Sequence, residues 1–269
     1  MSILKIQNLS MSFGGILAVD DVSFEVRQGD VHALIGPNGA GKTTVLNCIS
    51  RFYTPQSGAV VFQPARDAST NLLPLKAHQI GQLGIARTFQ NLELFAELTV
   101  FDNVLMARSQ AMKSNLFETL LSLPRYRRDE SEQKHYTEQL LETLGLQTVA
   151  YSVVKDLPYG TQKMVELARA MALEPKLILL DEPATGMNAK EIEGLGSQLK
   201  KLQSLTGATL LLIEHSMPLV MRISDQITVM HNGRFLAQGT PAEIKKDSAV
   251  IEAYLGKNKN VTHTSAVNG

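Results

Sequence analysis

The chain has 269 residues, of which 44% are hydrophobic, and its 26 basic and 26 acidic residues give a formal net charge of zero at pH 7. This length allows one large α/β domain or two small ones. No stretch forms a basic stripe, so the composition gives no support for nucleic-acid binding. The single cysteine, Cys48, excludes an internal disulfide, suits a reducing compartment and is predicted to be a core residue.

Signals for secretion and membrane insertion are also lacking. The N-terminus has no basic region followed by an apolar stretch and a small-residue cleavage site. The longest apolar clusters, such as residues 210–213, are far shorter than the roughly 18 residues that a membrane helix needs. We therefore expect a protein that is soluble by itself and reaches a membrane only through a partner.

The first part of the chain has strand character at residues 3–9 and 22–26, the second with alternating apolar side chains. A turn at 28–30 leads into the apolar run 31–35, and a helix is expected at about 42–51. A further turn at 55–58 precedes a strand-like segment at 59–62. Alternating strands followed by continuously apolar ones predict a small antiparallel sheet set against a buried parallel sheet.

A helical insertion is expected from about 91 to 166, because apolar residues recur at helical spacing in 100–106 and 136–146. The charged stretch 125–130 between them is interpreted as a solvated helix face or connection, with a contact surface as the alternative.

Buried parallel strands are expected next at 177–180 and 209–213, separated by a helix at about 189–204. Asn232 and Gly233 signal a tight hairpin, and residues 240–243 form a capping box with Pro241 at the first helical position. Residues 257–269 are polar and small, which predicts disorder.

A phosphate loop is predicted at residues 36–44, which read GPNGAGKTT and match the pattern G-x-x-x-x-G-K-[ST] between a strand and a helix. Glycines allow successive backbone N–H groups to surround phosphate oxygens, and the helix directs its positive end at the same anion. Lys42 is expected to reach the β- and γ-phosphates, and the Thr43 hydroxyl to bind Mg²⁺. The alternative is a glycine turn that binds nothing.

Two adjacent carboxylates, Asp181 and Glu182, end the apolar strand at 177–180. Neighbours on a strand point to opposite sides, so Asp181 can face Mg²⁺ while Glu182 polarises a water beside the γ-phosphate. The alternative is that both cap the next helix or form surface salt bridges. His215 follows the strand at 209–213, where it can donate to a γ-phosphate oxygen or be an ordinary polar strand end.

The order of five motifs resembles the ATP-binding cassette (ABC) family over about residues 3–255. These motifs are the phosphate loop, RTFQN at 87–91, LPYGTQ at 157–162, LLDEP at 179–183 and IEH at 213–215. Details are most similar to the ATP-binding subunits of branched-chain amino acid importers: YG at 159–160, GMN at 186–188 and the ending GTPAEI at 239–244 with AYLG at 253–256.

The resemblance implies a role for each matching residue. Phe13 would stack on adenine, although a lone phenylalanine near a strand end is otherwise usually core. Gln90 would touch Mg²⁺ and the attacking water, Asp181 would be the metal ligand, Glu182 the general base and His215 the γ-phosphate switch. The implied phosphate cradle is Gly36, Asn38, Gly39, Gly41, Lys42, Thr43 and Thr44. In this family two cassettes face each other head to tail, so Tyr159, Gly160, Thr161 and Gln162 of one would close over ATP held by the other.

The signature segment, residues 157–162, departs from the family pattern LSGGQ. Pro158 replaces the serine, Tyr159 a glycine and Thr161 the glutamine. Proline has neither hydroxyl nor N–H, so the donors left for phosphate are the N–H groups at the helix start and the Thr161 hydroxyl. The alternative is a signature that no longer contacts nucleotide. Asn188 stands where the family commonly has aspartate, so that contact across the two cassettes would be neutral.

The predicted fold class is α/β: a P-loop NTPase core with a parallel sheet, a small N-terminal antiparallel β subdomain and a helical insertion. Residues 1–90 are expected to form the nucleotide-binding core with the antiparallel subdomain, and 91–166 the helical subdomain with the signature. Residues 167–240 would complete the core, and 241–269 would form a C-terminal helix and a disordered tail.

By resemblance, the predicted function is an ATPase that powers an importer of branched-chain or other small amino acids. ATP and Mg²⁺ would be the cofactors. The implied partners are polytopic permease subunits, a second identical or paralogous cassette and, indirectly, a periplasmic or extracellular solute-binding protein, with no nucleic acid. The chain would lie peripherally on the cytoplasmic face of the cell membrane.

Three alternatives compete with this reading. Related importers carry amides, urea or other small polar solutes. A soluble cassette ATPase of DNA repair or translation would have a long coiled-coil insertion or two fused cassettes. A phosphate-loop kinase or GTPase would not explain Gly160 and Gln162 before a helix, and the guanine-reading motif Asn-Lys-x-Asp is absent from the sequence.

Overall fold

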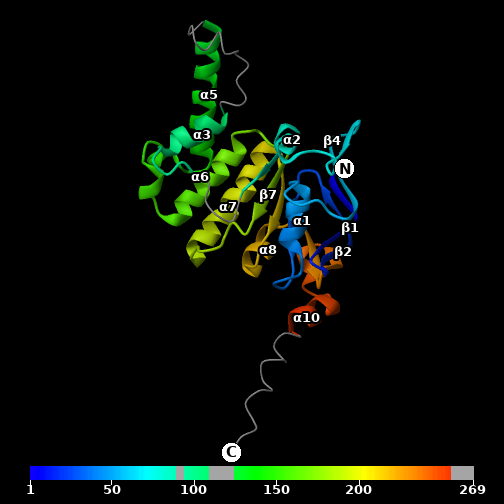
Figure 1. Cartoon of the computed structure of the whole chain (residues 1–269). Helices are drawn as coiled ribbons and strands as arrows, with labels where there is room; N and C mark the ends of the chain where they lie inside the picture. Colours follow the sequence, from blue (N-terminus) through cyan, green and yellow to red (C-terminus); the bar gives the residue numbers. More distant parts are fainter. Residues whose placement is uncertain (89–93, 109–123, 256–269) are drawn as a thin grey trace, which may run out of the picture. The chain divides into compact units, whose positions relative to one another are not determined.

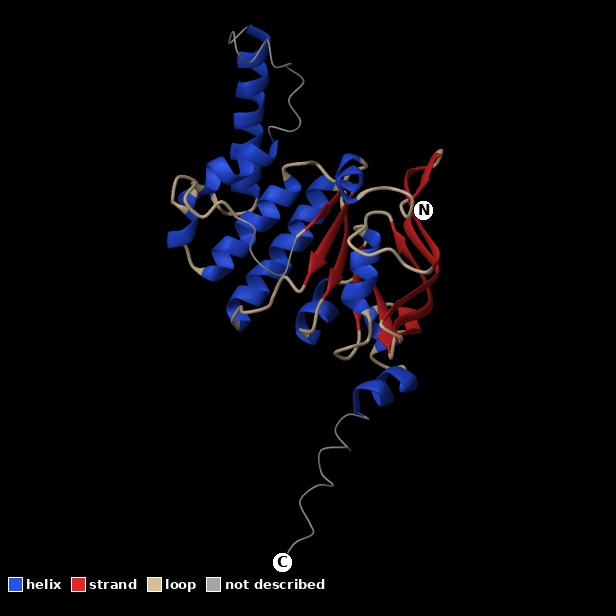
Figure 2. Cartoon of the chain, viewed as in Figure 1, coloured by secondary structure: helices blue, strands red, loops and turns tan. Residues whose placement is uncertain are grey.

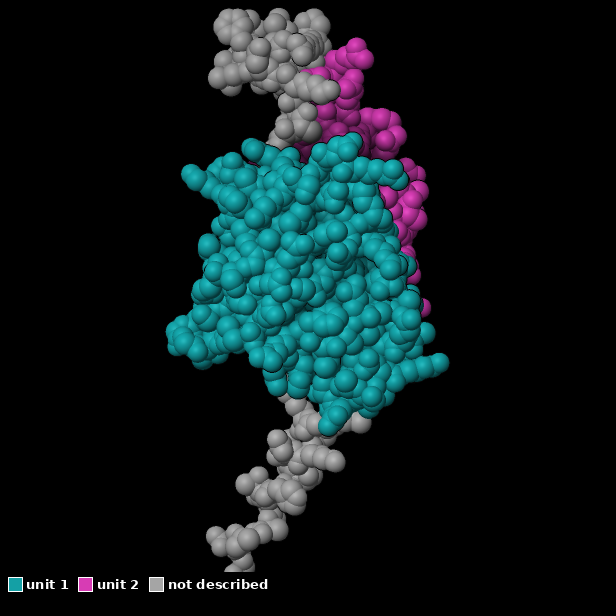
Figure 3. All heavy atoms as spheres, turned by 90° about the vertical axis from the view of Figure 1, so that its right-hand side faces the viewer, with its two compact units in different colours: residues 1–83, 209–269 teal, residues 84–208 magenta. Residues whose placement is uncertain are grey.

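The computed structural model describes residues 1–88, 94–108 and 124–255 (Figure 1). They form two compact units, Met1–Leu83 with Thr209–Gly269 (unit 1) and Gly84–Ala208 (unit 2), which Figure 3 colours separately. Among the described residues, no helix is both long and apolar enough to cross a bilayer. The expected disorder of residues 257–269 concerns residues outside the described part.

Unit 1 carries two sheets. In chain order its elements are β1 (Ser2–Phe13), β2 (Ile16–Arg27), β3 (Val31–Ile35), α1 (Lys42–Ile49), β4 (Ser57–Ala65), β5 (Ala68–Asn71), α2 (Ala77–Gln82), β8 (Thr209–Ile213), α8 (Met217–Ile223), β9 (Gln226–His231), β10 (Arg234–Gly239), α9 (Pro241–Ile244) and α10 (Ser248–Leu255). One sheet is antiparallel, in the order β2-β1-β4-β5. In the other, β3 pairs parallel with β8 and β9, and β10 is antiparallel to β9. This confirms an antiparallel subdomain beside a buried parallel sheet.

Unit 2 contains β6 (Ile85–Arg87), α3 (Val100–Arg108), α5 (Pro124–Thr143), two 3₁₀ turns (Gln147–Val149 and Val154–Asp156), α6 (Tyr159–Met171), β7 (Leu177–Asp181) and α7 (Ala189–Thr206). Strands β6 and β7 are parallel neighbours. Figure 2 shows the helices in blue and the strands in red. Helix formation at 100–106 and 189–204 is confirmed. The charged stretch 125–130 lies within α5, where the Arg128 side chain is exposed and pairs with Glu132 one turn on.

The early strands are longer than the sequence indicated. Each of β1 and β2 has 12 residues, and the register of their pairing shifts at several points, including between Ile6 and Leu9. Asn8 and Asp21 adopt positive φ angles of 47° and 53° near these shifts. Such bulges interrupt the two-residue alternation that marks a strand, so the pattern detects only part of each one.

The predicted hairpin, capping box and buried cysteine are confirmed. Asn232 and Gly233 have φ angles of 48° and 78°, which suit the two-residue hairpin between β9 and β10. The Thr240 side chain accepts from the Glu243 N–H while the Glu243 carboxylate accepts from the Thr240 N–H, as a capping box requires. Cys48 is free and buried as expected, and burial raises the pKa of its thiol to about 11.

His32, in the middle of β3, is a core histidine that the sequence pattern did not single out. It is fully buried, its Nε2 lies 2.8 Å from the Thr228 hydroxyl, and its ring stacks on Phe24 at 5.9 Å between centroids. Because Phe24 belongs to β2, this stack joins the antiparallel and parallel sheets of unit 1. Burial, reinforced by the Arg27 charge, lowers the pKa of His32 to about 4.

The lowered pKa predicts a pH-dependent stability. Between the ordinary pKa of 6.5 and about 4, unfolded His32 takes up a proton that folded His32 does not, so stability is lost as the pH falls. We expect His32 to contribute a decrease of about 2 kcal/mol in unfolding free energy between pH 7 and pH 5. Urea unfolding at several pH values measures this for the parent and for His32→Gln, which does not titrate. Equal pH slopes for the two proteins would contradict the assignment.

Candidate nucleotide-binding site

The phosphate loop in unit 1 lies between the fully buried strand β3 and helix α1. Gly41, the residue before the helix, has a φ of 92°, in the left-handed region that favours glycine. A Cβ at Gly41 would lie 2.3 Å from the Ala18 carbonyl oxygen of β2, and a Cβ at Gly36 would lie 2.1 Å from the Met230 carbonyl oxygen of β9. Neither position has room for a side chain.

Lys42 is the first residue of α1, and its side chain folds back over the phosphate loop. Its ammonium group donates to the carbonyl oxygens of Gly36, at 2.9 Å, and Pro37, at 3.1 Å, and the residue is buried. Thr43, the next residue, is exposed on the first helical turn, and Asn38 and Gly39 are exposed in the loop. The lysine therefore crosses a loop whose outer surface is open to solvent.

His215 lies at the carboxyl end of the strand beside the phosphate loop. Leu34 of β3 pairs in parallel register with Ile213 of β8. Gly36 lies two residues after Leu34, and His215 lies two residues after Ile213. The turn after β8 is fixed by Glu214, a buried carboxylate that accepts from the N–H groups of His215 and Ser216. His215 itself is exposed. Sequence reasoning placed the histidine correctly and missed the carboxylate that shapes its turn.

Phe13 ends β1 and is 41% exposed, so it is not the core residue that its position would ordinarily indicate. Its ring meets Tyr53 edge to face, with the centroids 5.1 Å apart and the planes at 73°. This arrangement leaves an aromatic surface open while holding its orientation. Tyr53, in the loop after α1, was not predicted.

Tyr254 brings the C-terminal helix α10 into the same region of unit 1. Burial raises the pKa of its phenol to about 12, and the backbone N–H of Gly36 in the phosphate loop opposes that rise. The Tyr254 hydroxyl makes no hydrogen bond within the described residues, so it lies near Gly36 without bonding to it. A tyrosine 218 residues along the chain from Gly36 gives no local sequence signal of this proximity.

In unit 2, Asp181 is the last residue of the buried strand β7 and is itself buried. The Arg87 guanidinium, at the end of β6, donates to its Oδ2 at 3.0 Å. Glu182 has a φ of 49°, so the chain leaves the strand there, and its carboxylate accepts from the Thr185 hydroxyl at 3.2 Å. The two adjacent carboxylates therefore have different partners in the protein, and neither Arg87 nor Thr185 was predicted as one of them.

The surroundings of Asp181 act on its carboxyl in opposite directions. Burial raises the pKa of its carboxyl, the charge of Glu182 adds to the rise, and Arg87 and Lys163 oppose it. Among the described residues, no group of three or more His, Cys, Asp and Glu side chains could hold a metal by itself. Mg²⁺ is usually held by one or two protein oxygens together with substrate phosphates. The Asp181 carboxylate in unit 2 and the Thr43 hydroxyl in unit 1 are each an oxygen group of the kind that Mg²⁺ accepts.

The signature segment starts helix α6 at Tyr159, preceded by Pro158 as its N-cap residue without a side-chain cap. Gln162 turns back and donates to the Leu157 carbonyl oxygen at 2.8 Å. Tyr159 is 42% exposed, and Gly160 and Thr161 are half-buried beside it. The helix thus presents its first N–H groups without a capping side chain, the donor arrangement that the sequence indicated.

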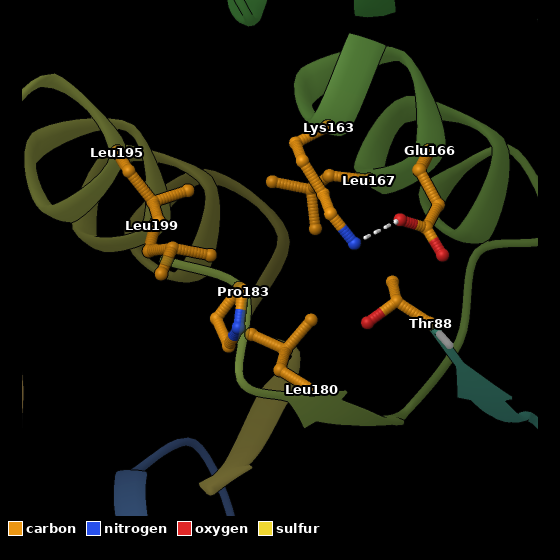
Figure 4. Close-up of a pocket in the computed structure, with 8 residues that line it drawn as sticks. All are labelled: Thr88, Lys163, Glu166, Leu167, Leu180, Pro183, Leu195 and Leu199. Carbon is orange, nitrogen blue, oxygen red and sulfur yellow. Dashed lines mark hydrogen bonds and ion pairs between the residues drawn. The ribbon is translucent and has the colours of Figure 1, made fainter. Parts of the chain in front are cut away.

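A buried ion pair not foreseen from the sequence lies on the inner side of α6. Lys163 Nζ is 3.3 Å from Glu166 Oε2, and both side chains are at most 9% exposed. Figure 4 shows them beside the Thr88 hydroxyl and above Pro183, which follows Glu182. Leu195 and Leu199 of α7 complete the lining, and a cavity of about 10 Å³ has room for at most one water. This cluster is therefore structural rather than a ligand pocket.

The structure places the predicted residues in two groups. Unit 1 holds Phe13, residues 36–44 and His215, and unit 2 holds residues 159–162, Asp181 and Glu182. Gln90 lies outside the described residues. A glycine loop between a buried strand and a helix, with a second buried strand that ends in two carboxylates, defines a P-loop ATPase of the cassette type.

Comparison with known proteins identifies the family. The ABC transporter family model matches residues 19–185, and the model described as "Branched-chain amino acid ATP-binding cassette transporter" matches residues 236–259. The chain belongs to the ABC transporter family and is an ATP-binding cassette ATPase of it.

Relatives and solved structures support the same family assignment. The chain is 44% identical to the high-affinity branched-chain amino acid transport ATP-binding protein LivG of Salmonella typhimurium, with 95% of this chain and 98% of the relative covered. It is 43% identical to BraF of Pseudomonas aeruginosa, with the same coverage. The ADP conformation of MJ1267, an ATP-binding cassette of an ABC transporter, superposes with a TM-score of 0.80 at 31% identity, covering 95% of this chain and 99% of that one.

Substitution of Gly41 tests the packing of the phosphate loop. Alanine at this position meets the Ala18 carbonyl oxygen at 2.3 Å and a φ of 92°. Left-handed backbone alone costs a residue with a side chain about 1–3 kcal/mol. We therefore expect Gly41→Ala to lower the unfolding free energy by at least this much and to abolish ATP binding, as measured by urea unfolding and nucleotide titration.

Gly194 supplies the matched control. It is exposed within α7 and has no atom within 4 Å of an added Cβ. Alanine there should stabilise the protein by up to about 1 kcal/mol and leave ATP binding unchanged. Parental stability and nucleotide affinity in Gly41→Ala would show that the loop tolerates a side chain.

Proposed function

We propose that this cassette hydrolyses ATP to power an importer of branched-chain amino acids. The observation that carries the substrate assignment is the match of residues 236–259 to the branched-chain amino acid type of cassette. The relatives LivG and BraF, whose names state high-affinity branched-chain amino acid transport, support the same assignment. The proposed location is the cytoplasmic face of the cell membrane, reached through permease subunits.

The proposed mechanism gives each predicted side chain one role toward the nucleotide. Phe13 stacks on adenine, and the loop amides with Lys42 neutralise the phosphates. Thr43, Asp181 and Gln90 are the proposed protein ligands of Mg²⁺, which when bound supplies positive charge against the β- and γ-phosphates. Such preorganised charge stabilises the transferring phosphoryl group without reorganisation during the reaction.

Glu182 is the proposed general base. Its carboxylate is partly accessible and accepts from the Thr185 hydroxyl, and in the proposed role it orients water for in-line attack. His215, exposed at the end of β8, is proposed to donate to a γ-phosphate oxygen and so to distinguish ATP from ADP. Both roles follow from the family resemblance together with the accessibility of the two side chains.

A second cassette, identical or paralogous, is proposed to complete the site. Tyr159, Gly160, Thr161 and Gln162 of each copy would close over ATP held by the other, with helix N–H groups as phosphate donors. We propose that residues 91–166 form the subdomain that couples closure to the permease. In the same division, residues 1–90 and 167–240 form the core, and 241–269 the C-terminal segment.

Replacement of Glu182 tests the proposed base. Glu182→Gln keeps the shape and the hydrogen bond to Thr185 but cannot accept a proton, so ATP binding should persist. Turnover should fall by about 10²–10⁴-fold, the usual contribution of a general base. Radiolabelled ATP measures binding and hydrolysis in the same preparation. Glu193→Gln, an exposed carboxylate on α7, should retain both activities; unchanged hydrolysis in Glu182→Gln would remove Glu182 from the role.

Reconstitution with the permease and solute-binding subunits of a branched-chain amino acid importer tests the transport assignment. Leucine, isoleucine and valine should stimulate ATP hydrolysis in proteoliposomes, because the solute must signal through the permease to the cassette. Stimulation by amides or urea instead would identify a different solute. Stimulation by DNA or RNA, without any permease, would favour the soluble ATPase class.

A further inference from the structure

Arg87 and Asp181 form a buried ion pair that the proposed mechanism does not use. Nη2 of Arg87 lies 3.0 Å from Oδ2 of Asp181, and the side chains are only 9% and 6% exposed. Both residues end parallel neighbouring strands: Arg87 pairs in register with Leu179, and the Thr88 N–H donates to the Leu179 carbonyl oxygen. The sheet therefore fixes both backbones, and the pair is not a contact between flexible surface groups.

Burial makes a counter-charge at Asp181 necessary. A buried carboxylate without a cation is strongly destabilising, and Glu182 next to it adds negative charge. Lys163 also acts on Asp181 through its charge, but its ammonium is 3.3 Å from Glu166. Within the described part of the chain, Arg87 is the cation in direct contact with Asp181.

The two oxygens of Asp181 are not equivalent. Oδ2 accepts from Arg87, while within residues 1–88, 94–108 and 124–255 no hydrogen bond or ion pair is made to Oδ1. A guanidinium bound to one oxygen fixes the rotation of the carboxylate, and thereby aims the other oxygen. Carboxylates that bind metals are commonly held in this way by a second residue.

We propose that Arg87 is a positioning residue for magnesium binding: it holds Oδ2 of Asp181 so that Oδ1 is presented to the cation of the Mg²⁺–nucleotide complex. The inference rests on the proposed function, in which Asp181 is a metal ligand. Arg87 itself touches neither nucleotide nor metal. Its effect is to keep the carboxylate oriented before the nucleotide arrives, so little reorganisation is needed on binding.

Magnesium titrations in the non-hydrolysing Glu182→Gln background test this role. A fluorescent ATP analogue is bound first in EDTA and then at increasing Mg²⁺. Addition of Arg87→Gln should leave binding in EDTA within about twofold, because the phosphate loop is intact. The Mg²⁺ concentration for half-maximal enhancement of binding should rise about 10–100-fold, the usual effect of removing a residue that supports a metal ligand.

Two further variants make the result specific. Arg87→Lys keeps the charge without the planar fork, so its Mg²⁺ requirement should lie between those of parent and Arg87→Gln. It also tests the proposal if Arg87→Gln fails to fold. Arg108→Gln removes a comparable guanidinium of unit 2, 12% exposed and paired with Glu174 at 3.0 Å, and should leave the Mg²⁺ requirement unchanged.

The outcomes separate this inference from the proposed function. If nucleotide binding in the Glu182→Gln background does not depend on Mg²⁺, or does not occur, the proposed function is wrong. If it depends on Mg²⁺ equally with and without Arg87, the positioning role is wrong. A lower Mg²⁺ requirement in Arg87→Gln would mean that Arg87 competes with the metal, which also overturns the role. A Mg²⁺ requirement in Arg87→Lys equal to that of the parent would refute the need for the guanidinium fork.

Discussion

The close approach of three backbones determines the architecture around the phosphate loop. Carbonyl oxygens of Ala18 in β2 and Met230 in β9 lie where the side chains of residues 41 and 36 would start, so both positions must be glycine. The antiparallel sheet is consequently more than an accessory to the nucleotide-binding core. Its strand β2 packs directly against the phosphate loop, and the stack of Phe24 on His32 connects β2 to β3.

Elements whose signals are local could be predicted from the sequence. The phosphate loop, the hairpin at Asn232 and Gly233 and the cap at Thr240 each depend on residues within a few positions of one another. The buried strands β3, β7 and β8 can be recognised in the sequence as short apolar runs, because each is buried along its whole length. The residues expected at their carboxyl ends, among them Asp181 and His215, follow directly from that placement.

Contacts between distant residues could not be predicted in this way. Arg87 and Asp181 are 94 positions apart, and Phe13 reaches Tyr53 across β2, β3 and α1. The bulges of β1 and β2 were also missed, because they change the period that the pattern depends on. The sequence therefore did not reveal which residues contact the predicted ones. These partners decide how each side chain is charged and aimed.

The departures from the family signature in unit 2 depend on one another. Tyr159, which replaces a glycine, has its ring 3.0 Å from the place of a Cβ at Gly186, so the larger side chain is accommodated because residue 186 has none. Asn188, which replaces aspartate, caps α7 by accepting from the N–H groups of Lys190 and Glu191. The Glu191 carboxylate in turn lies 2.9 Å from where a Cβ would stand on Gly160. Residue 159 is therefore packed against residue 186, and Gly160 lies against Glu191, which belongs to the cap of α7. The start of the signature helix and the segment after Glu182 are thereby joined within a single cassette.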